Sequence, residues 1–327
     1  MIANEAPALP VAPTKHADAQ VCPICGTPNP LDWLAASDWF HGRTKKYQLL
    51  RCSTCSLVRL KDPPSPSEMG EHYGQAYDRA ISTASQTSEH WFSRRDAVLH
   101  FKNSGALLDL GCGSGGFLSA IKGPSWQLYG VEMSDNAAAI ARDRCGAQVF
   151  VGDVLDAPFQ PNSFDAITCF NVFEHMYEPD AVLAQVAKWL KPGGVFYTMM
   201  PNIDSAAMRI FRSYWYALEL PRHLYHFSPA TLKMLGENSG LTVVSIKTHR
   251  ELYFETSVRY VVDDLLRKRG IPRKSVADSY PDNSSIPWRA VRKVFRVAAM
   301  PIINAAASLY GDGETITAVF TKNAASA

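Results

Sequence analysis

The chain has 327 residues, and its 33 lysines and arginines nearly balance its 31 aspartates and glutamates. The net charge of +2 argues against a general polyanion binder, because nucleic-acid-binding domains carry a clear basic excess. With 46% hydrophobic residues, the chain is long enough to form two domains, or one large domain with a smaller one. No apolar run approaches the roughly 18 residues of a membrane span.

Residues 1–20 are rich in alanine and proline. They lack the basic start and the continuous apolar stretch of a secretory signal, so we expect a disordered tail. Without an export signal the expected compartment is the cytoplasm, where reducing conditions favour metal sites over disulfides.

Residues 21–62 contain two C-x2-C pairs, and these predict a zinc ribbon. The four cysteines are Cys22, Cys25, Cys52 and Cys55. Each tight turn offers two thiolates, and two such turns complete a tetrahedral four-sulfur site of the kind that zinc favours. Because thiolates fill every position, we expect a structural zinc rather than a catalytic one.

Residues 63–104 are interpreted as a proline-rich linker followed by a helical lid. Ser67 is a candidate N-cap for a helix that runs to Ala80 and carries Tyr73 and Tyr77 on one face. The alternative is that these tyrosines only pack the helix against its domain. A second helix is expected over Trp91–His100.

From residue 105 onward, short apolar runs alternate with helical segments. The expected strands are 107–110, 128–132, 148–151, 164–170, 195–200, 241–247 and 315–321. This alternation predicts an α/β fold, in which a doubly wound parallel sheet has helices on both faces. Residues 105–327 form the expected domain, with an insertion at 248–314.

The first of these strands runs into a glycine-rich turn and then a helix, which is the pattern of a nucleotide cradle. The glycines are Gly111, Gly113 and Gly115, and on their own they also match the dinucleotide fingerprint. Polar residues follow the next strands: Glu132, Asp153 and Asn171. In an open parallel sheet, ligands bind outside the carboxyl ends of the strands, where these residues are expected.

These motifs resemble, in order and spacing, the class I S-adenosylmethionine-dependent methyltransferases. The resemblance rests on Leu108-Asp-Leu-Gly-Cys-Gly-Ser-Gly115, Val131-Glu132, Gly152-Asp153, Phe164-Asp165, Phe173-Glu-His175 and Leu190-Lys-Pro-Gly-Gly194. It implies a Rossmann-like, seven-stranded sheet with an antiparallel last strand and S-adenosylmethionine across the first strand ends.

By the same resemblance, Asp109 and the 111–115 loop line the methionine end of the cofactor. Glu132 takes the ribose, Asp153 lies by the adenine, and Asn171 borders the methionine moiety. Each has a plainer alternative: Asp109 braces the loop, Glu132 is an ordinary strand-end carboxylate, and the last two make a loop cap and a turn.

Three histidines are candidate general bases for an acceptor hydroxyl or carbon acid: His175, His223 and His226. The alternative for each is a structural histidine bonded to the backbone. His223 and His226 are three residues apart and diverge in an extended segment, so we expect one of them, His223, to point into the acceptor pocket.

A zinc ribbon before a methyltransferase domain resembles bacterial small-molecule enzymes, including deoxysugar methyltransferases, and the segment 222–228 is similar to one in that group. The expected partner is therefore a small-molecule acceptor. The alternatives are an RNA base methyltransferase that uses the ribbon as a reader, and a non-catalytic scaffold. Residues 288–310 mix basic and apolar residues, which is typical of a helix docked on the domain or lying on a membrane surface. The sequence leaves the oligomeric state open.

Overall fold

The computed structural model describes residues 21–73, 89–250, 253–272, 275–277 and 313–323. The expectations for the tail 1–20, for Tyr77 and for the helix at 288–310 lie outside these residues. Among the described helices, none combines the length and apolar character needed to cross a membrane.

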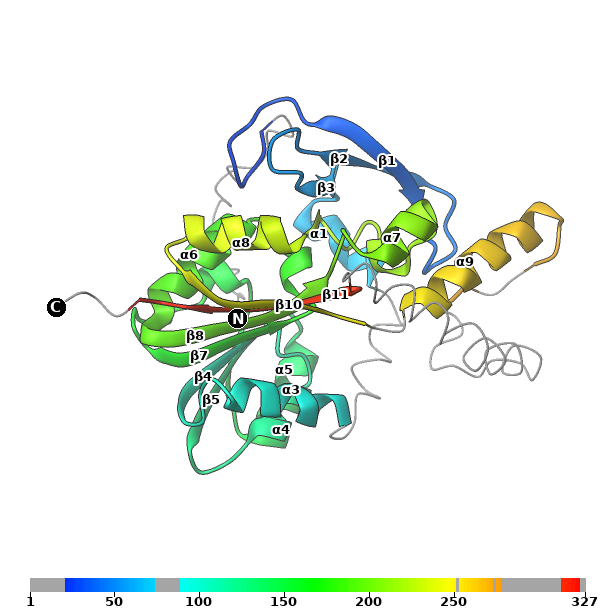
Figure 1. Ribbon diagram of the computed structural model, residues 1–327. Coiled ribbons are helices and arrows are strands. Elements are labelled where there is room, and N and C mark those ends of the chain that lie inside the picture. The colour runs from blue at the N-terminus through cyan, green and yellow to red at the C-terminus, as the bar shows by residue number, and fades with distance from the viewer. Residues whose placement is uncertain (1–20, 74–88, 251–252, 273–274, 278–312, 324–327) are drawn as a thin grey trace, which may run out of the picture.

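The core of the molecule is a seven-stranded sheet in the order β10-β11-β8-β7-β4-β5-β6 (Figure 1). The strands are β4 (Gly105–Leu110), β5 (Trp126–Glu132), β6 (Gln148–Val151), β7 (Phe164–Phe170), β8 (Leu190–Pro201), β10 (Thr242–His249) and β11 (Thr315–Thr321). The central strands pair in parallel, whereas β11 is antiparallel to both β8 and β10. This confirms the predicted α/β fold with its antiparallel last strand.

Helices cover both faces of this sheet (Figure 1). One face carries α3 (Glu89–Leu99), α4 (Gly116–Ile121) and α5 (Asp135–Cys145), and the other carries α6 (Pro179–Trp189) and α8 (Pro229–Asn238). The helix α8 begins with a capped first turn: the Ser228 hydroxyl accepts a hydrogen bond from the Thr231 amide, and Pro229 occupies the first turn. Each face buries its own hydrophobic cluster.

A second, four-stranded sheet in the order β1-β2-β3-β9 holds the cysteine-bearing segment. It comprises β1 (Leu31–Ser37), β2 (Lys46–Arg51), β3 (Val58–Leu60) and β9 (Tyr225–His226). The last of these strands comes from the far part of the chain, and there Val58 pairs with His226. The ribbon residues also share one hydrophobic cluster with the α6 and α8 face of the large sheet. The ribbon is therefore joined to the rest by a strand pairing and by a common core.

The segment after the ribbon differs from the expected long helix. It forms α1 (Pro66–Met69) and the 3₁₀ turn η1 (Gly70–His72), and the N-cap is Ser65 rather than Ser67. The Ser65 amide donates to the Glu68 carboxylate, so the capping box starts two residues earlier than predicted. The expected continuation to Ala80 passes out of the described residues after Tyr73.

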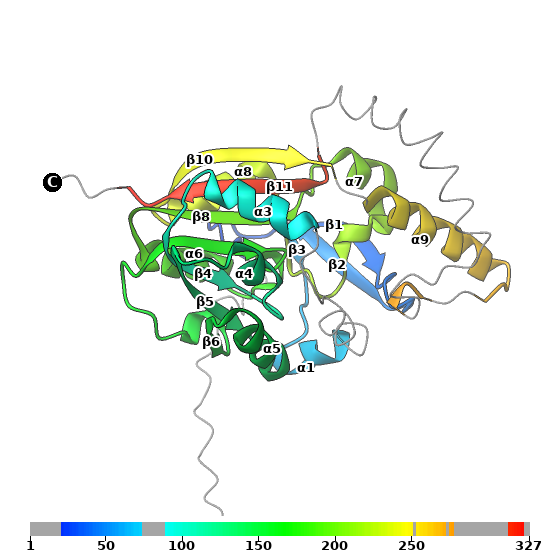
Figure 2. The same cartoon turned by 90° about the horizontal axis from the view of Figure 1, so that it is seen from below.

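The remaining elements gather beside the ribbon (Figure 2). They are α7 (Ala206–Phe211), η4 (Arg212–Tyr214), η5 (Tyr216–Leu218) and α9 (Tyr253–Lys268). The α9 helix is the described start of the insertion, and Tyr214 donates a hydrogen bond to its Asp264 at 2.7 Å. The α9 helix thus packs against the segment that contains η4 and η5, which leads to the histidines of the site.

Candidate functional site

The glycine loop between β4 and α4 contains three residues with left-handed backbone, at φ values of 68°, 52° and 77° for Gly111, Gly113 and Gly115. Their missing side chains serve different purposes. A Cβ on Gly111 would lie 2.5 Å from the Val172 side chain, and one on Gly115 would lie 3.0 Å from Ala141. A Cβ on Gly113 would meet nothing within 4 Å. Only Gly113 therefore borders open space, into which a bound group can approach the backbone.

Glu132 ends β5 and holds this loop in place. Its two carboxylate oxygens accept hydrogen bonds of 2.9 Å from the amides of Gly113 and Ser134. The side chain is buried, and each carboxylate oxygen has a second lone-pair site for a further donor. Glu132 can therefore shape the loop and accept a ribose hydroxyl at the same time.

Asp109 lies deep in the sheet, only 3% exposed. It accepts a 2.7 Å hydrogen bond from the Thr168 hydroxyl on β7, and no bond from the glycine loop is recorded for it among the described contacts. Burial raises the pKa of Asp109 to about 7, against the opposing Thr168 hydrogen bond. Asp109 thus links two central strands just below the loop.

Asp153 and Asn171 follow β6 and β7. Asp153 caps the 3₁₀ turn η2 (Val154–Asp156) by accepting from the Leu155 amide at 2.8 Å, which is the loop-cap role left open above. Asn171 has left-handed backbone at φ 54°, and its buried Oδ1 atom has no hydrogen-bond partner within the described structure. An orphaned buried acceptor in the loop after β7 fits a ligand that brings its own donor. These residues therefore fit S-adenosylmethionine.

The four ribbon cysteines converge in the way a four-sulfur metal site requires. The Sγ atoms of Cys22 and Cys55 lie 3.5 Å apart, and those of Cys25 and Cys52 lie 3.4 Å apart. All four sulfurs lie within 4.8 Å of one another. With zinc–sulfur bonds of about 2.3 Å, a regular tetrahedron has sulfur separations of about 3.8 Å. The two turns also match: Gly26 and Ser56 both have positive φ, and their amides donate to the carbonyls of Cys22 and Cys52.

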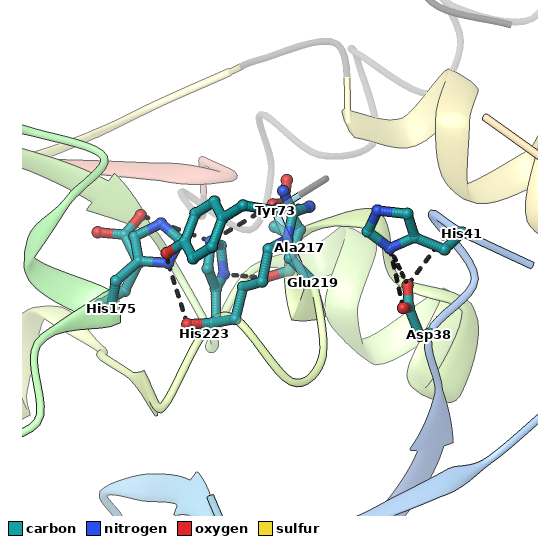
Figure 3. A network of polar contacts seen from close by, with 9 residues as sticks. Asp38, His41, Tyr73, His175, Ala217, Glu219 and His223 are labelled. Atoms are coloured by element: carbon teal, nitrogen blue, oxygen red, sulfur yellow. Dashed lines mark hydrogen bonds and ion pairs between the residues drawn. The ribbon is translucent and has the colours of Figure 1, made fainter. Parts of the chain in front are cut away.

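The three histidines lie together in the fold, as Figure 3 shows for two of them. His175 ends the 3₁₀ turn η3 (Phe173–His175), which directly follows β7, and its ring centre is 4.6 Å from that of His223. The rings of His223 and His226 are 6.1 Å apart, and both side chains are buried. That His223 alone points into the acceptor pocket stays a prediction, since burial is common to both side chains.

Burial keeps these imidazoles neutral. It lowers the pKa of His175 to about 3 and that of His226 to about 3, and it lowers the pKa of His223 well below the usual value. A group with so low a pKa is a weak proton acceptor at neutral pH, since efficient general bases have pKa values near the operating pH. The electrostatics therefore give little support to the proposed base role.

The structure adds neighbours that sequence reasoning missed. Glu174 is 2% exposed, and burial raises its pKa to about 8, with help from the nearby Glu219 charge. Its backbone carbonyl accepts from the Leu224 amide at 2.9 Å, which joins η3 to the segment 222–226. Arg222 pairs with Glu219 at 2.7 Å. The only sequence signal for Glu174 was its position beside His175, because nothing local shows that it is buried.

Tyr73 brings the linker after the ribbon to the histidines. Its hydroxyl lies 3.3 Å from the Nδ1 atom of His175 (Figure 3). Burial raises the pKa of Tyr73 to about 12, and the charges of Glu219, Glu174 and Glu132 add to this. The linker after the ribbon therefore reaches the histidines.

A separate cavity of about 440 Å³ lies at the opposite edge of the sheet. Its lining includes Gly105, Trp126 and Phe164, which begin β4, β5 and β7. It is thus remote from the carboxyl ends of the strands, where the residues described above gather.

A family model described as a methyltransferase domain matches residues 83–246. The ubiquinone biosynthesis O-methyltransferase of Thiobacillus denitrificans is 30% identical over 147 residues, which cover 41% of this chain and 63% of that protein. The demethylmenaquinone methyltransferase of Symbiobacterium thermophilum is 27% identical over 153 residues, which cover 41% of this chain and 61% of that protein. The chain therefore spans less than two thirds of the length of these relatives.

Two solved structures share the fold. The [4+2]-cyclase SpnF aligns with a TM-score of 0.52 at 18% identity, over 80% of this chain and 98% of that chain. A chain from the complex of the Haloferax volcanii Trm112 methyltransferase activator with a putative methyltransferase aligns with a TM-score of 0.51 at 18% identity, over 77% of this chain and 98% of that chain. Because one of them is named as a cyclase, the fold alone does not fix the chemistry. The match to the family model covers half of the sequence, and the chain therefore belongs to the methyltransferase-domain family.

Proposed function

We propose that this protein transfers a methyl group from S-adenosylmethionine to a small-molecule acceptor. One observation carries the proposal: residues suited to the cofactor follow four adjacent strands, β7-β4-β5-β6, at one edge of the sheet. They are Asn171 after β7, the glycine loop after β4, Glu132 at the end of β5 and Asp153 after β6. Family membership supports the same activity.

In this proposal Glu132 receives the ribose, Gly113 leaves room for the cofactor, and the Asn171 amide oxygen accepts a donor from the methionine end. S-adenosylmethionine supplies an activated methyl group on a sulfonium. The protein's main task is then to hold the acceptor at attack distance and to exclude water. The buried side chains of His223 and His226 indicate that such a dry environment lies close to the loop after β7.

We place the acceptor against the histidine cluster. The loop after β7 connects the two parts of the site: Val172 packs on Gly111, and three residues later comes His175. The relatives are named for quinone biosynthesis, which supports a small organic acceptor. A hydroxylated quinone precursor is therefore our first choice, ahead of the deoxysugar that the sequence pattern favoured.

RNA base methylation receives less support, because three of the six basic residues of the ribbon are buried or lie near an acidic side chain, although Lys45 and Lys46 are exposed. Arg59 is 9% exposed. Arg43 lies 3.8 Å from Asp38, and Lys61 lies 3.2 Å from Asp32. A solvent-facing basic surface on the ribbon would be needed for a reader of RNA. The scaffold alternative explains neither the open space at Gly113 nor the arrangement of Glu132.

The test is methyl transfer from labelled S-adenosylmethionine to hydroxylated quinone precursors, nucleotide sugars and stripped RNA. We expect a small molecule to be methylated. His223→Asn should lower turnover while cofactor affinity stays unchanged, because His223 lies where we place the acceptor and helps to position it. Methylation of RNA in preference to every small molecule would overturn the acceptor class, and failure to bind S-adenosylmethionine would overturn the activity.

A further inference from the structure

Glu174, His175 and His223 bring three metal-ligating groups to one point outside the cysteine site. One ligand atom from each lies within 4.8 Å of the other two. The Nε2 atom of His223 is 3.9 Å from the Oε1 atom of Glu174, and the two imidazole rings meet edge to face at 4.6 Å. Figure 3 shows the two rings side by side.

The hydrogen bonds of the two imidazoles fix which nitrogen is free. The Nδ1 atom of His175 lies 3.0 Å from the Arg222 carbonyl, and the Nδ1 atom of His223 lies 2.9 Å from the Ala217 carbonyl. A carbonyl oxygen only accepts, so both Nδ1 atoms carry the proton and both Nε2 atoms keep a lone pair. Metal-bound histidines show the same arrangement, in which the other ring N–H donates to a backbone carbonyl or carboxylate.

Glu174 provides an independent observation. Its side chain is 2% exposed, and neither carboxylate oxygen has a hydrogen-bond partner within the described structure. The nearby Arg222 does not compensate it, since that guanidinium pairs with Glu219 at 2.7 Å. A buried carboxylate without donors is costly unless a cation lies beside it.

We propose that Glu174, His175 and His223 bind one divalent transition metal ion, distinct from the metal of the ribbon. One carboxylate and two imidazoles suit zinc or ferrous iron and leave coordination positions open, unlike a closed four-thiolate site. His175 is half-buried, so the cluster keeps some contact with solvent. The site lies on the loop after β7, where an acceptor oxygen would complete the coordination and become more acidic. This last role rests on the proposed function, whereas metal binding itself does not.

The experiment titrates Co²⁺ into the purified full chain after the ribbon has been filled with zinc. We expect one equivalent of Co²⁺ to bind and to show d–d absorption without thiolate-to-cobalt charge transfer. Glu174→Gln should weaken Co²⁺ binding at least about tenfold, the effect of losing a ligand or its close support. Glu219→Gln is the matched control. The Oε2 atom of Glu219 lies 3.7 Å from the same Nε2 atom, but Glu219 pairs with Arg222 and does not converge with the other two groups, so its loss should leave the affinity within about threefold.

The wild-type protein alone can overturn the proposal. The proposal fails if zinc-loaded protein binds no Co²⁺, or if every cobalt absorption band has thiolate character. An equal loss in both glutamine variants would also overturn it. Thermal melting and zinc content show whether each variant is folded. Neither S-adenosylmethionine nor an acceptor is present, so a missing methyltransferase activity and a missing metal site give separate results.

Discussion

The Gly113 amide donates a 2.9 Å hydrogen bond to the Oε2 atom of Glu132, and this bond ties the glycine loop of β4 to the end of β5. One carboxylate therefore has two duties, because it holds the loop and faces the space where we place the ribose. We expect Glu132→Ala to weaken S-adenosylmethionine binding by about 1.5–3 kcal/mol, the range for hydrogen bonds to a charged group. Calorimetry measures the change. Glu132→Gln keeps one acceptor oxygen and should lose less, and unchanged affinity in the alanine variant would remove the ribose assignment.

Alanine substitutions at two glycines of the loop should affect the free energy of unfolding and the cofactor affinity to different extents. Gly111→Ala forces a Cβ to within 2.5 Å of Val172 at φ 68°, so it should lower the free energy of unfolding by about 2–5 kcal/mol through strain and overpacking. Gly113→Ala meets no neighbour within 4 Å and carries only the backbone strain of about 1–2 kcal/mol.

Denaturant unfolding and cofactor titration of both variants check this contrast. We expect Gly113→Ala to show the larger loss of cofactor affinity for its smaller loss of stability. If it binds the cofactor like the wild type, the open space beside Gly113 is not the cofactor's.

Asp109 should make folding and cofactor binding depend on pH. Its folded pKa of about 7 is above the usual value of 3.8 for this side chain, so the native state binds an extra proton between these pH values. Its contribution to stability is present below pH 3.8 and is lost as the pH rises to about 7, by up to about 1.4 kcal/mol per pH unit. Asp109→Asn should remove this slope in denaturant unfolding, measured against the wild type at each pH.

The positive sulfonium favours the ionised carboxylate, so cofactor binding at pH 7 should release up to about half a proton from Asp109. Calorimetry in buffers of different ionisation enthalpy detects that release, and Asp109→Asn should abolish it. Identical binding enthalpies in all buffers would show that Asp109 does not sense the cofactor's charge.

The ribbon should matter for turnover although its cysteines are not in the methyl-transfer site. The Leu60 amide donates to the Leu224 carbonyl at 2.8 Å, and Val58 pairs with His226, so β3 holds the histidine segment. We expect Cys22→Ser to increase amide exchange over residues 222–228 and to lower turnover more than tenfold. Cofactor affinity should be retained, since the residues that fit the cofactor lie on the large sheet.

Thr54→Ala is the control for this prediction. Its hydroxyl bonds to Thr27 across the same two turns, but it offers no thiolate. Unaltered exchange over residues 222–228 in Cys22→Ser would show that the ribbon does not support the histidines.

The large sheet was predictable because its signals are local. Each strand is a short apolar run. The ends of β4, β5 and β6 are marked in the sequence by Gly111, Glu132 and Gly152-Asp153, respectively. The helix α8 starts where Ser228 and Pro229 place it, because capping depends on neighbouring residues alone. Cofactor candidates at strand ends follow from the same order of elements.

The acceptor side was less predictable because it depends on contacts between distant segments. The strand β9 has two residues and exists through its pairing with β3, so no periodicity reveals it. The strand β1 was missed, since residues 31–37 lack a clear alternation. Glu174 is buried where η3 meets the segment that contains His223 and Leu224, and such a contact between distant parts of the chain leaves no local signal.

Because β9 is a strand of the ribbon sheet, the ribbon sheet can be completed only late in the synthesis of the chain. The ribbon lies near the N-terminus, but its fourth strand is synthesised only when the ribosome has passed residue 226. Until then β3 carries an unpaired edge, which is a site of mispairing in a nascent chain. Binding of a metal ion to the four cysteines would need no residue beyond Cys55 and could precede this step. The ribbon would then fold first, and the histidine segment would pair with its β3 edge last.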